Sequence, residues 1–376
     1  SHHSSQNHQH TVPVTSQYTP GPSRKILLSL FALVVAVLIA ALIDPANLYT
    51  LRRFSSRVVR SVTTASATST ATATGSNLKA DSKIKSGPSS IMKTPVYFLS
   101  HGGPNVMYET GHPAYKKLGS IGKEITTKVK PDAVVVFSAH WQGGRDVIYV
   151  NTAEMTDLVY DFYGFPDHYY NEKYPNVGSR KVADQVLAAL SGAGIEAKGV
   201  KRGLDHGVWA SFKCANKCPT TQPSNQKQTP LNVPIVQVSL FDTEDPDQHY
   251  RLGQAVSHLR EKNILIIVSG MSVHNLRDLR FTRGGNAPPM PYAVSFDEAL
   301  KDAVVSDPAE RQGKMAKLLD RPDARQAHPS FDHLLPIHVG AGAAGDDLGK
   351  RLWTLPEGSM SWAQFRFGDV NASSSL

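Results

Sequence analysis

Residues 134–141 constrain the fold of this chain most, because a continuous apolar run ends there in polar residues and a histidine. The segment reads VVVFSAHW and is bounded by Pro131 on one side and Gly143 on the other. A strand that is apolar at successive positions is typical of a parallel sheet covered on both faces. Ligands of such α/β sheets bind beyond the carboxyl ends of the strands, which is where His140 stands.

Two further segments repeat this design. Residues 96–104 read VYFLSHGGP and contain His101, and residues 264–275 read ILIIVSGMSVHN and contain His274. A single histidine is more often a buried or capping residue than a ligand. Three histidines at strand ends favour a metal site instead, since a divalent ion needs neutral imidazoles held by rigid elements.

The rest of the chain from residue 92 alternates between helical and strand periodicity. Helices are predicted over residues 114–129, 179–191, 249–261, 292–305 and 309–319, and strands over 147–150, 195–200 and 234–240, with an edge strand over 358–367. Residues 161–175 are aromatic and predict a loop that walls a pocket, and residues 204–209 predict a turn. This alternation predicts an α/β fold, a single domain with a central, mostly parallel sheet flanked by helices.

The chain divides into five regions by composition. We expect a disordered tail over 1–25, a transmembrane helix over 26–43, a flexible linker over 44–91, the catalytic domain over 92–370 and a tail over 371–376.

The transmembrane prediction rests on length and hydrophobicity. Residues 26–43 carry no charge and would span about 27 Å as a helix. A cleaved targeting segment is the alternative, because residues 1–80 contain a single acidic residue, Asp44. The arginines that follow this segment predict a membrane-anchored protein with its catalytic domain in the cytosol or the mitochondrial matrix.

Charge and cysteine content limit the partners. The net charge is +8, but residues 1–91 hold nine Lys and Arg against two acidic residues and supply +7 of it. The catalytic part is therefore nearly neutral, which argues against nucleic-acid binding and favours small-molecule partners. Cys214 and Cys218 are the only cysteines, too few for a disulfide framework or a zinc ribbon, and residues 216–232 predict a surface insertion.

Six short motifs occur in a fixed order along the catalytic part. They are SHGGP at 100–104, SAHW at 138–141, GFP at 164–166, LDHGVW at 204–209, VHNLR at 273–277 and HLLP at 333–336. Together they resemble the class III extradiol ring-cleaving dioxygenases, and within them the branch similar to 4,5-DOPA dioxygenase. The resemblance covers roughly residues 94–368.

The resemblance implies a set of site residues. His101, His140 and His333 would hold one metal ion, with His274 beside it as acid and base or as a fourth ligand. His206 would line the substrate pocket and assist catalysis. More distant members of the class bind ferrous iron through two histidines and a glutamate, whereas three imidazoles also suit zinc, so Fe²⁺ and Zn²⁺ both remain open.

The expected activity is therefore an oxidoreductase that inserts O₂ into a catechol-type, DOPA-like substrate and opens its ring. Three protein ligands leave one face of the metal ion open, and a chelating catechol and O₂ require that open face. A zinc-dependent hydrolase that uses a metal-bound hydroxide is one alternative, and a non-catalytic binding protein with the same pocket is another. The sequence leaves the oligomeric state and the position of ring opening undetermined.

Overall fold

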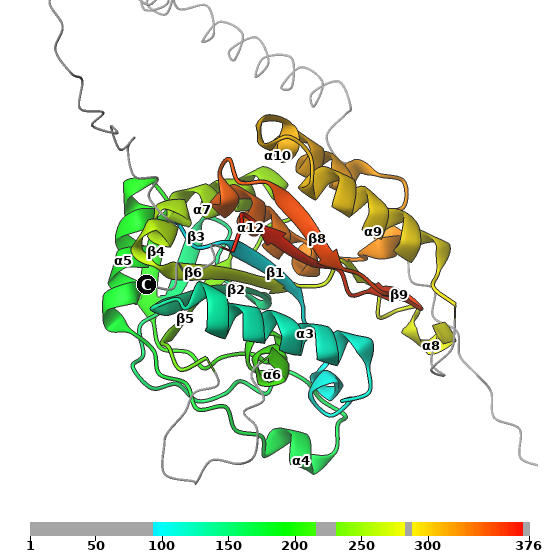
Figure 1. The fold of residues 1–376 in the computed structure, drawn as a ribbon, viewed down its shortest axis with the longest axis horizontal. Coiled ribbons are helices and arrows are strands. Elements are labelled where there is room, and N and C mark those ends of the chain that lie inside the picture. Colours follow the sequence, from blue (N-terminus) through cyan, green and yellow to red (C-terminus); the bar gives the residue numbers. More distant parts are fainter. Residues whose placement is uncertain (1–92, 216–230, 283–287, 371–376) are drawn as a thin grey trace, which may run out of the picture. The chain divides into compact units, whose positions relative to one another are not determined.

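The computed structural model describes residues 93–215, 231–282 and 288–370, all within one compact unit of the chain, Ser86–Leu376. The main sheet is built from β1 (Val96–Ser100), β2 (Ala133–Gln142), β3 (Val147–Asn151), β4 (Glu196–Val200), β5 (Ile235–Leu240), β6 (Ile264–Gly270), β8 (Gly349–Trp353) and β11 (Gln364–Phe367). Within the described residues these strands form one sheet in the order β4-β3-β5-β2-β6-β1-β11-β8 (Figure 1).

The centre of this sheet is parallel. Strand β2 pairs in parallel with β5 and β6, and β6 pairs in parallel with β1. Antiparallel pairing occurs where β3 meets β5 and where β11 lies between β1 and β8. The predicted α/β fold with a mostly parallel sheet is thus confirmed, and the carboxyl ends of β1, β2 and β6 meet at one edge.

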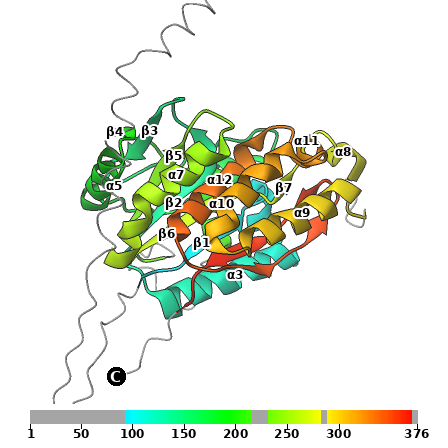
Figure 2. The ribbon, with the colours of Figure 1, turned by 90° about the horizontal axis from the view of Figure 1, so that it is seen from above.

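Helices cover both faces of the sheet. They are α3 (Pro113–Glu124), α4 (Asp167–Tyr170), α5 (Arg180–Gly192), α6 (His206–Ala215), α7 (Pro246–Val256), α8 (Leu279–Thr282), α9 (Pro291–Val304), α10 (Pro308–Lys317), α11 (Ala324–Ala327) and α12 (Leu335–Ala344). Shorter helical turns are η1 (Pro104–Met107), η2 (Ile125–Val129), η3 (Ser257–Lys262), η4 (Leu318–Asp320) and η5 (Phe331–His333). Figure 1 shows α3 and α6 below the sheet, with α7, α9 and α10 above it, and Figure 2 gives the view from above.

Burial on both faces explains the apolar runs in the sequence. In β1, Val96 and Phe98 belong to the hydrophobic cluster that includes α5, α7 and α12. Tyr97 and Leu99 point to the opposite face and join the cluster that includes α3 and α6. Because successive side chains of a strand alternate between faces, a strand covered on both sides must be apolar at every position.

A second, small sheet follows the carboxyl end of β6. Its strands are β7 (Val273–His274), β9 (Pro356–Glu357) and β10 (Met360–Ser361), in the order β7-β10-β9. Met360 is paired with His274 on one side and with Glu357 on the other. This sheet therefore carries His274 out of the main sheet and joins it to the C-terminal part of the chain.

Two local predictions are corrected by the structure. Residues 204–209 were expected to form a turn, but α6 begins at His206, and the buried Asp205 before it accepts hydrogen bonds from Ser138 Oγ at 2.8 Å and Gln237 Nε2 at 2.5 Å. The edge strand expected over 358–367 is two strands, β10 and β11, and β11 lies inside the sheet. The edge on that side of the sheet is β8, whose Lys350 and Arg351 are the kind of residues that protect an exposed strand.

The expected membrane-anchored localisation is also corrected. Over residues 93–215, 231–282 and 288–370, none of the helices is both long enough and apolar enough to cross a bilayer. The segment 26–43 lies outside the described residues, as do the tails over 1–25 and 371–376, the whole linker over 44–91, and most of the insertion over 216–232.

Candidate metal centre and substrate cavity

Two histidines reach the carboxyl edge of the sheet directly from strands. His101 follows the last residue of β1, and His140 lies near the end of β2. Because β1 and β2 both pair in parallel with β6, their ends stand at the same level. The side chains consequently meet, with His140 Nε2 3.2 Å from His101 Nε2.

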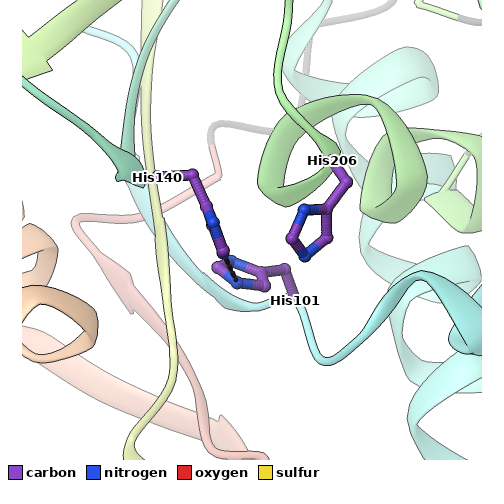
Figure 3. Close-up of side chains that lie close together, drawn as sticks. All are labelled: His101, His140 and His206. Carbon is purple, nitrogen blue, oxygen red and sulfur yellow. Dashed lines mark hydrogen bonds between the residues drawn. The ribbon is translucent and has the colours of Figure 1, made fainter. Parts of the chain in front are cut away.

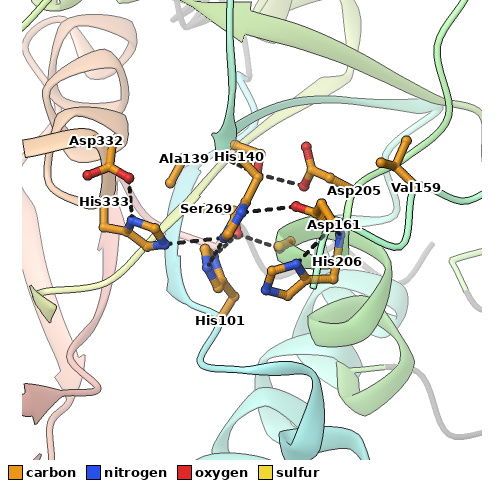
Figure 4. Close-up of polar contacts among 12 residues, drawn as sticks. His101, Ala139, His140, Val159, Asp161, Asp205, His206, Ser269, Asp332 and His333 are labelled. Atoms are coloured by element: carbon orange, nitrogen blue, oxygen red, sulfur yellow. Dashed lines mark hydrogen bonds and ion pairs between the residues drawn. The ribbon is translucent and has the colours of Figure 1, made fainter. Parts of the chain in front are cut away.

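His333 comes to the same place from a helical turn far along the chain. The backbone N–H of Met271, just beyond β6, donates to the carbonyl oxygen of His333 at 3.0 Å. A Cβ atom on Gly270 would lie 2.2 Å from that oxygen, so only glycine allows this approach. The result is that His333 Nε2 lies 3.2 Å from His140 Nε2 (Figure 4).

The Nδ1 atoms of these three rings face oxygen atoms. His101 Nδ1 lies 2.8 Å from Ser269 Oγ, whose own proton goes to the carbonyl oxygen of Gly207 at 2.5 Å. His140 Nδ1 lies 3.0 Å from a carboxylate oxygen of Asp161. Because Ser269 gives its own proton to Gly207, its oxygen accepts from His101, which assigns the His101 ring proton to Nδ1 and leaves the lone pair on Nε2. The Asp161 carboxylate lies within ion-pair distance of His140 Nδ1.

His333 follows the same pattern through a different carboxylate. Its Nδ1 lies 2.9 Å from Asp332 Oδ2, and Asp332 Oδ1 accepts a hydrogen bond from Ser330 Oγ at 2.6 Å. Burial would raise the pKa of Asp332, but its contact with His333 outweighs burial and holds that pKa well below its usual range. A fixed carboxylate behind a histidine is a common way to orient a metal ligand.

The Nε2 atoms of His101 and His333 both approach that of His140, and a positive ion among the three would stabilise nitrogen atoms held this close. Two imidazole nitrogens bound to one ion at about 2.1 Å lie about 3.0–3.4 Å apart, and the two contacts of His140 Nε2 measure 3.2 Å. Burial holds the pKa values of His101 and His333 below their usual range, so both rings are neutral donors. The residues present therefore fit a divalent metal ion.

His206 is the fourth histidine of the cluster. Figure 3 shows it beside His101 and His140, and these three side chains offer donor atoms that all lie within 4.8 Å of one another. Its Nδ1 lies 2.8 Å from Asp161 Oδ1. Asp161 therefore contacts two imidazoles at once, one through each oxygen, because His140 faces its other oxygen.

His274 packs against His333. Its ring stacks on that of His333 with 3.6 Å between centroids and 9° between planes. Burial holds the pKa of His274 well below its usual range, and the neighbouring His333 ring lowers it further. His274 is thus a neutral imidazole that lines the cavity beside His333.

These histidines open into one large cavity of about 1090 Å³. Aromatic rings from the predicted loop form part of its wall, namely Phe162, Tyr163 and Phe165, and Trp362 forms another part. The prediction that residues 161–175 wall a pocket agrees with this geometry. A cavity of this size holds a substrate considerably larger than a bare catechol ring.

Comparison with known proteins identifies the family. The family model of the catalytic LigB subunit of aromatic ring-opening dioxygenase matches residues 95–362. The chain belongs to this LigB family. It is therefore a metal-dependent extradiol dioxygenase, as its motifs predicted.

Named relatives of this LigB-family chain match it over most of their own length. A 4,5-DOPA dioxygenase extradiol of Beta vulgaris is 33% identical over 275 residues, covering 72% of this chain and 95% of the relative. A 4,5-DOPA dioxygenase extradiol-like protein of Schizosaccharomyces pombe is 32% identical over 284 residues, covering 72% and 91%. A crystal structure of an uncharacterized Escherichia coli K12 protein has a TM-score of 0.58 at 25% identity, covering 73% of this chain and 100% of that one.

The sequence analysis missed the two carboxylates of this LigB-family site. Asp332 directly precedes His333, and this adjacency was a usable signal, since a ligand histidine often has an acidic partner. Asp161 gave no such signal, because it lies 21 residues from His140 at the start of a loop noted only for its aromatic residues. Its role depends on how that loop folds over the sheet.

We expect Asp161→Asn to weaken metal binding by about 10- to 100-fold, the usual cost of losing a residue that orients ligands. An asparagine has one acceptor oxygen, so it accepts from His140 or from His206 but not from both. Metal affinity measured by competition with a chelator tests this expectation. Asp167→Asn, an exposed change in the same loop, serves as the control, and equal affinities for both variants would exclude this role for Asp161.

Proposed function

We propose that this LigB-family chain opens the ring of a DOPA-like catechol with O₂, using a ferrous ion held by His101, His140 and His333. The observation that carries the proposal is the pair of 3.2 Å contacts that joins the three Nε2 atoms. The names of the relatives, 4,5-DOPA dioxygenases extradiol, support the substrate class.

Ferrous iron is the metal that suits this chemistry. When bound, it supplies the redox-active centre at which the catechol and O₂ react, a role that zinc cannot fill. Three neutral nitrogen donors suit iron and zinc alike, so the preference for iron follows from the reaction and not from the ligands.

His274 is proposed as the acid and base. A catechol loses a proton from a hydroxyl group when it binds, and a neutral imidazole beside the site accepts it. The parallel stack with His333 fixes the plane of the His274 ring, and His274 lines the cavity that the substrate would occupy. The same ring then returns the proton to the opened product.

His206 is proposed as a residue of the substrate pocket. Asp161 holds its Nδ1, so its Nε2 is directed toward the cavity that it lines. The edge of Phe162 meets the His206 ring at 89° with 5.6 Å between centroids. This pair provides a wall against which an aromatic substrate can pack while His206 Nε2 contacts its polar groups.

Oxygen uptake tests the proposed function. Anaerobically purified protein loaded with Fe²⁺ should consume O₂ when DOPA is added, and a ring-opened product should accumulate. Protein loaded with Zn²⁺ should consume none. Elemental analysis of the protein as purified without added metal shows which ion it retains, and hydrolytic activity that persists without O₂ in the zinc form would point to a hydrolase instead.

We also propose that residues 92–370 form the catalytic domain by themselves. The family match over 95–362 supports this boundary, as does the location of every site residue between 101 and 362. A protein of residues 92–376 is expected to retain full oxygen uptake with DOPA and the unfolding temperature of the whole chain. Aggregation of this shorter protein under conditions where the whole chain stays folded would place part of the core before residue 92.

A further inference from the structure

Glu357 stands opposite His274 across the small sheet. Met360 is the antiparallel partner of both residues, so the three lie in one row across β7, β10 and β9. Directly paired residues of neighbouring strands project to the same face of a sheet. All three side chains line the substrate cavity, which agrees with that expectation.

The sheet sets the distance between these two side chains. Neighbouring strands lie about 4.8 Å apart, so residues two strands apart are separated by about 10 Å. A catechol joined to an amine by two carbon atoms measures about 8 Å from hydroxyl oxygen to nitrogen when extended. An ammonium group then lies about 2.8 Å from a carboxylate oxygen that binds it. A substrate of this length reaches Glu357 while its hydroxyl groups contact the histidine cluster.

One oxygen of Glu357 is available for such a contact. Its Oε2 accepts hydrogen bonds from His112 Nε2 and from Trp362 Nε1, both at 3.0 Å. Within the described part of the chain, Oε1 has no hydrogen-bond partner, and the side chain is 45% exposed. The carboxylate of Glu357, which lines the cavity, is thus held through one oxygen, and its other oxygen is unpaired within the described residues.

His112 does not cancel the charge of Glu357. The backbone N–H of Ala114 donates to His112 Nδ1 at 3.1 Å, as the cap of helix α3. This bond requires a lone pair on Nδ1, so the ring is neutral when it donates its Nε2 proton. The hydrogen bond to Glu357 raises the pKa of His112, but the cap opposes protonation.

The charge of the cavity favours a cationic group. Its charged residues within the described part of the chain are all acidic: Glu109, Asp161, Asp332 and Glu357. Asp161 and Asp332 are already bound to imidazoles beside the metal centre. No Lys or Arg lines the cavity in that same part of the chain, so a substrate carboxylate finds no ion-pair partner there.

We infer that Glu357 binds the amine of the substrate and selects catechols that carry an ammonium group about two carbons from the ring. This inference rests on the proposed function, since it assumes that a catechol occupies the histidine cluster. It predicts that dopamine is preferred to 3-(3,4-dihydroxyphenyl)propanoate, which has the same reach and the opposite charge, and that DOPA lies between them.

The test compares dopamine with the neutral 4-ethylcatechol in Fe²⁺-loaded whole protein. Glu357→Gln keeps an acceptor for Trp362 and removes the charge. The ratio of kcat/KM for dopamine to that for 4-ethylcatechol should fall by about two- to fivefold, the size of a partly exposed ion pair, mainly through KM. Glu109→Gln removes an equal charge from the same wall, where Asn105 binds Glu109, and should change the ratio by less than about twofold.

Several outcomes would overturn the inference. An equal loss for both catechols in Glu357→Gln would mean that Glu357 only holds Trp362 in place. If Glu109→Gln lowered the ratio as much as Glu357→Gln, the total negative charge of the cavity, and not contact with Glu357, would set the preference for dopamine. A wild-type protein that consumes no O₂ with any catechol would refute the proposed function instead. In that event, calorimetry with dopamine in the absence of O₂ decides the role of Glu357, because the Kd for dopamine should still rise by about two- to fivefold in Glu357→Gln.

Discussion

Replacing His333 by Ala should abolish metal retention, whereas replacing His206 by Ala should leave the metal in place. His333 Nε2 and His101 Nε2 each lie 3.2 Å from His140 Nε2, and removing one of three donors leaves a site with two. Structural metal affinity depends steeply on the number of ligands. Metal content after dialysis, measured by elemental analysis on both variants, gives the answer.

The His206 variant is the decisive control, because His206 also lies within reach of the cluster. His101, His140 and His206 offer donor atoms within 4.8 Å of one another, so His206 is the rival third ligand. Stoichiometric metal in His333→Ala together with loss of metal in His206→Ala would reverse the assignment. Loss of folding in either variant, seen by circular dichroism, would be resolved with His333→Gln and His206→Gln, which preserve more of the side-chain volume.

The second large effect is expected for His274→Gln, which should lower kcat by about 10²- to 10⁴-fold, the range for loss of a general base. Glutamine retains a polar group near the catechol but cannot accept and return its proton. Metal content should remain at the wild-type level, because His274 is assigned as a stacking neighbour of His333 and not as one of the three ligands. Single-turnover oxygen uptake with DOPA, run beside elemental analysis, measures both quantities.

Each other result for His274 has a distinct meaning. Joint loss of metal and activity would make His274 a fourth ligand, as the sequence analysis allowed. Turnover near the wild-type rate would exclude it from proton transfer and leave it a stacking partner of His333.

The uncharged state of His274, a consequence of burial that lowers its pKa, also predicts that kcat for bound substrate does not fall between pH 8 and pH 6.5. A fall in that interval would indicate a base with an ordinary imidazole pKa.

The sequence by itself determined the central strands and the histidines that they carry. Strands β1, β2 and β6 are buried on both faces. A strand in this environment is a continuous apolar run in the sequence, which can be recognised without the tertiary structure. His101, His140 and His274 follow or end such runs, so a parallel sheet must bring them to one edge. The family motifs added His333 and His206, which strand periodicity does not indicate.

The tertiary structure decided everything that depends on contacts between distant segments. The hydrogen bond from Met271 to His333 spans 62 residues, and no local pattern encodes it. The contacts of Asp161 with His140 and His206, the interior position of β11 and the alignment of Glu357 with His274 are of the same kind. Local sequence fixes which faces of an element are apolar, but which faces bury one another is decided by packing of the whole domain, and the chemistry of this site depends on that packing.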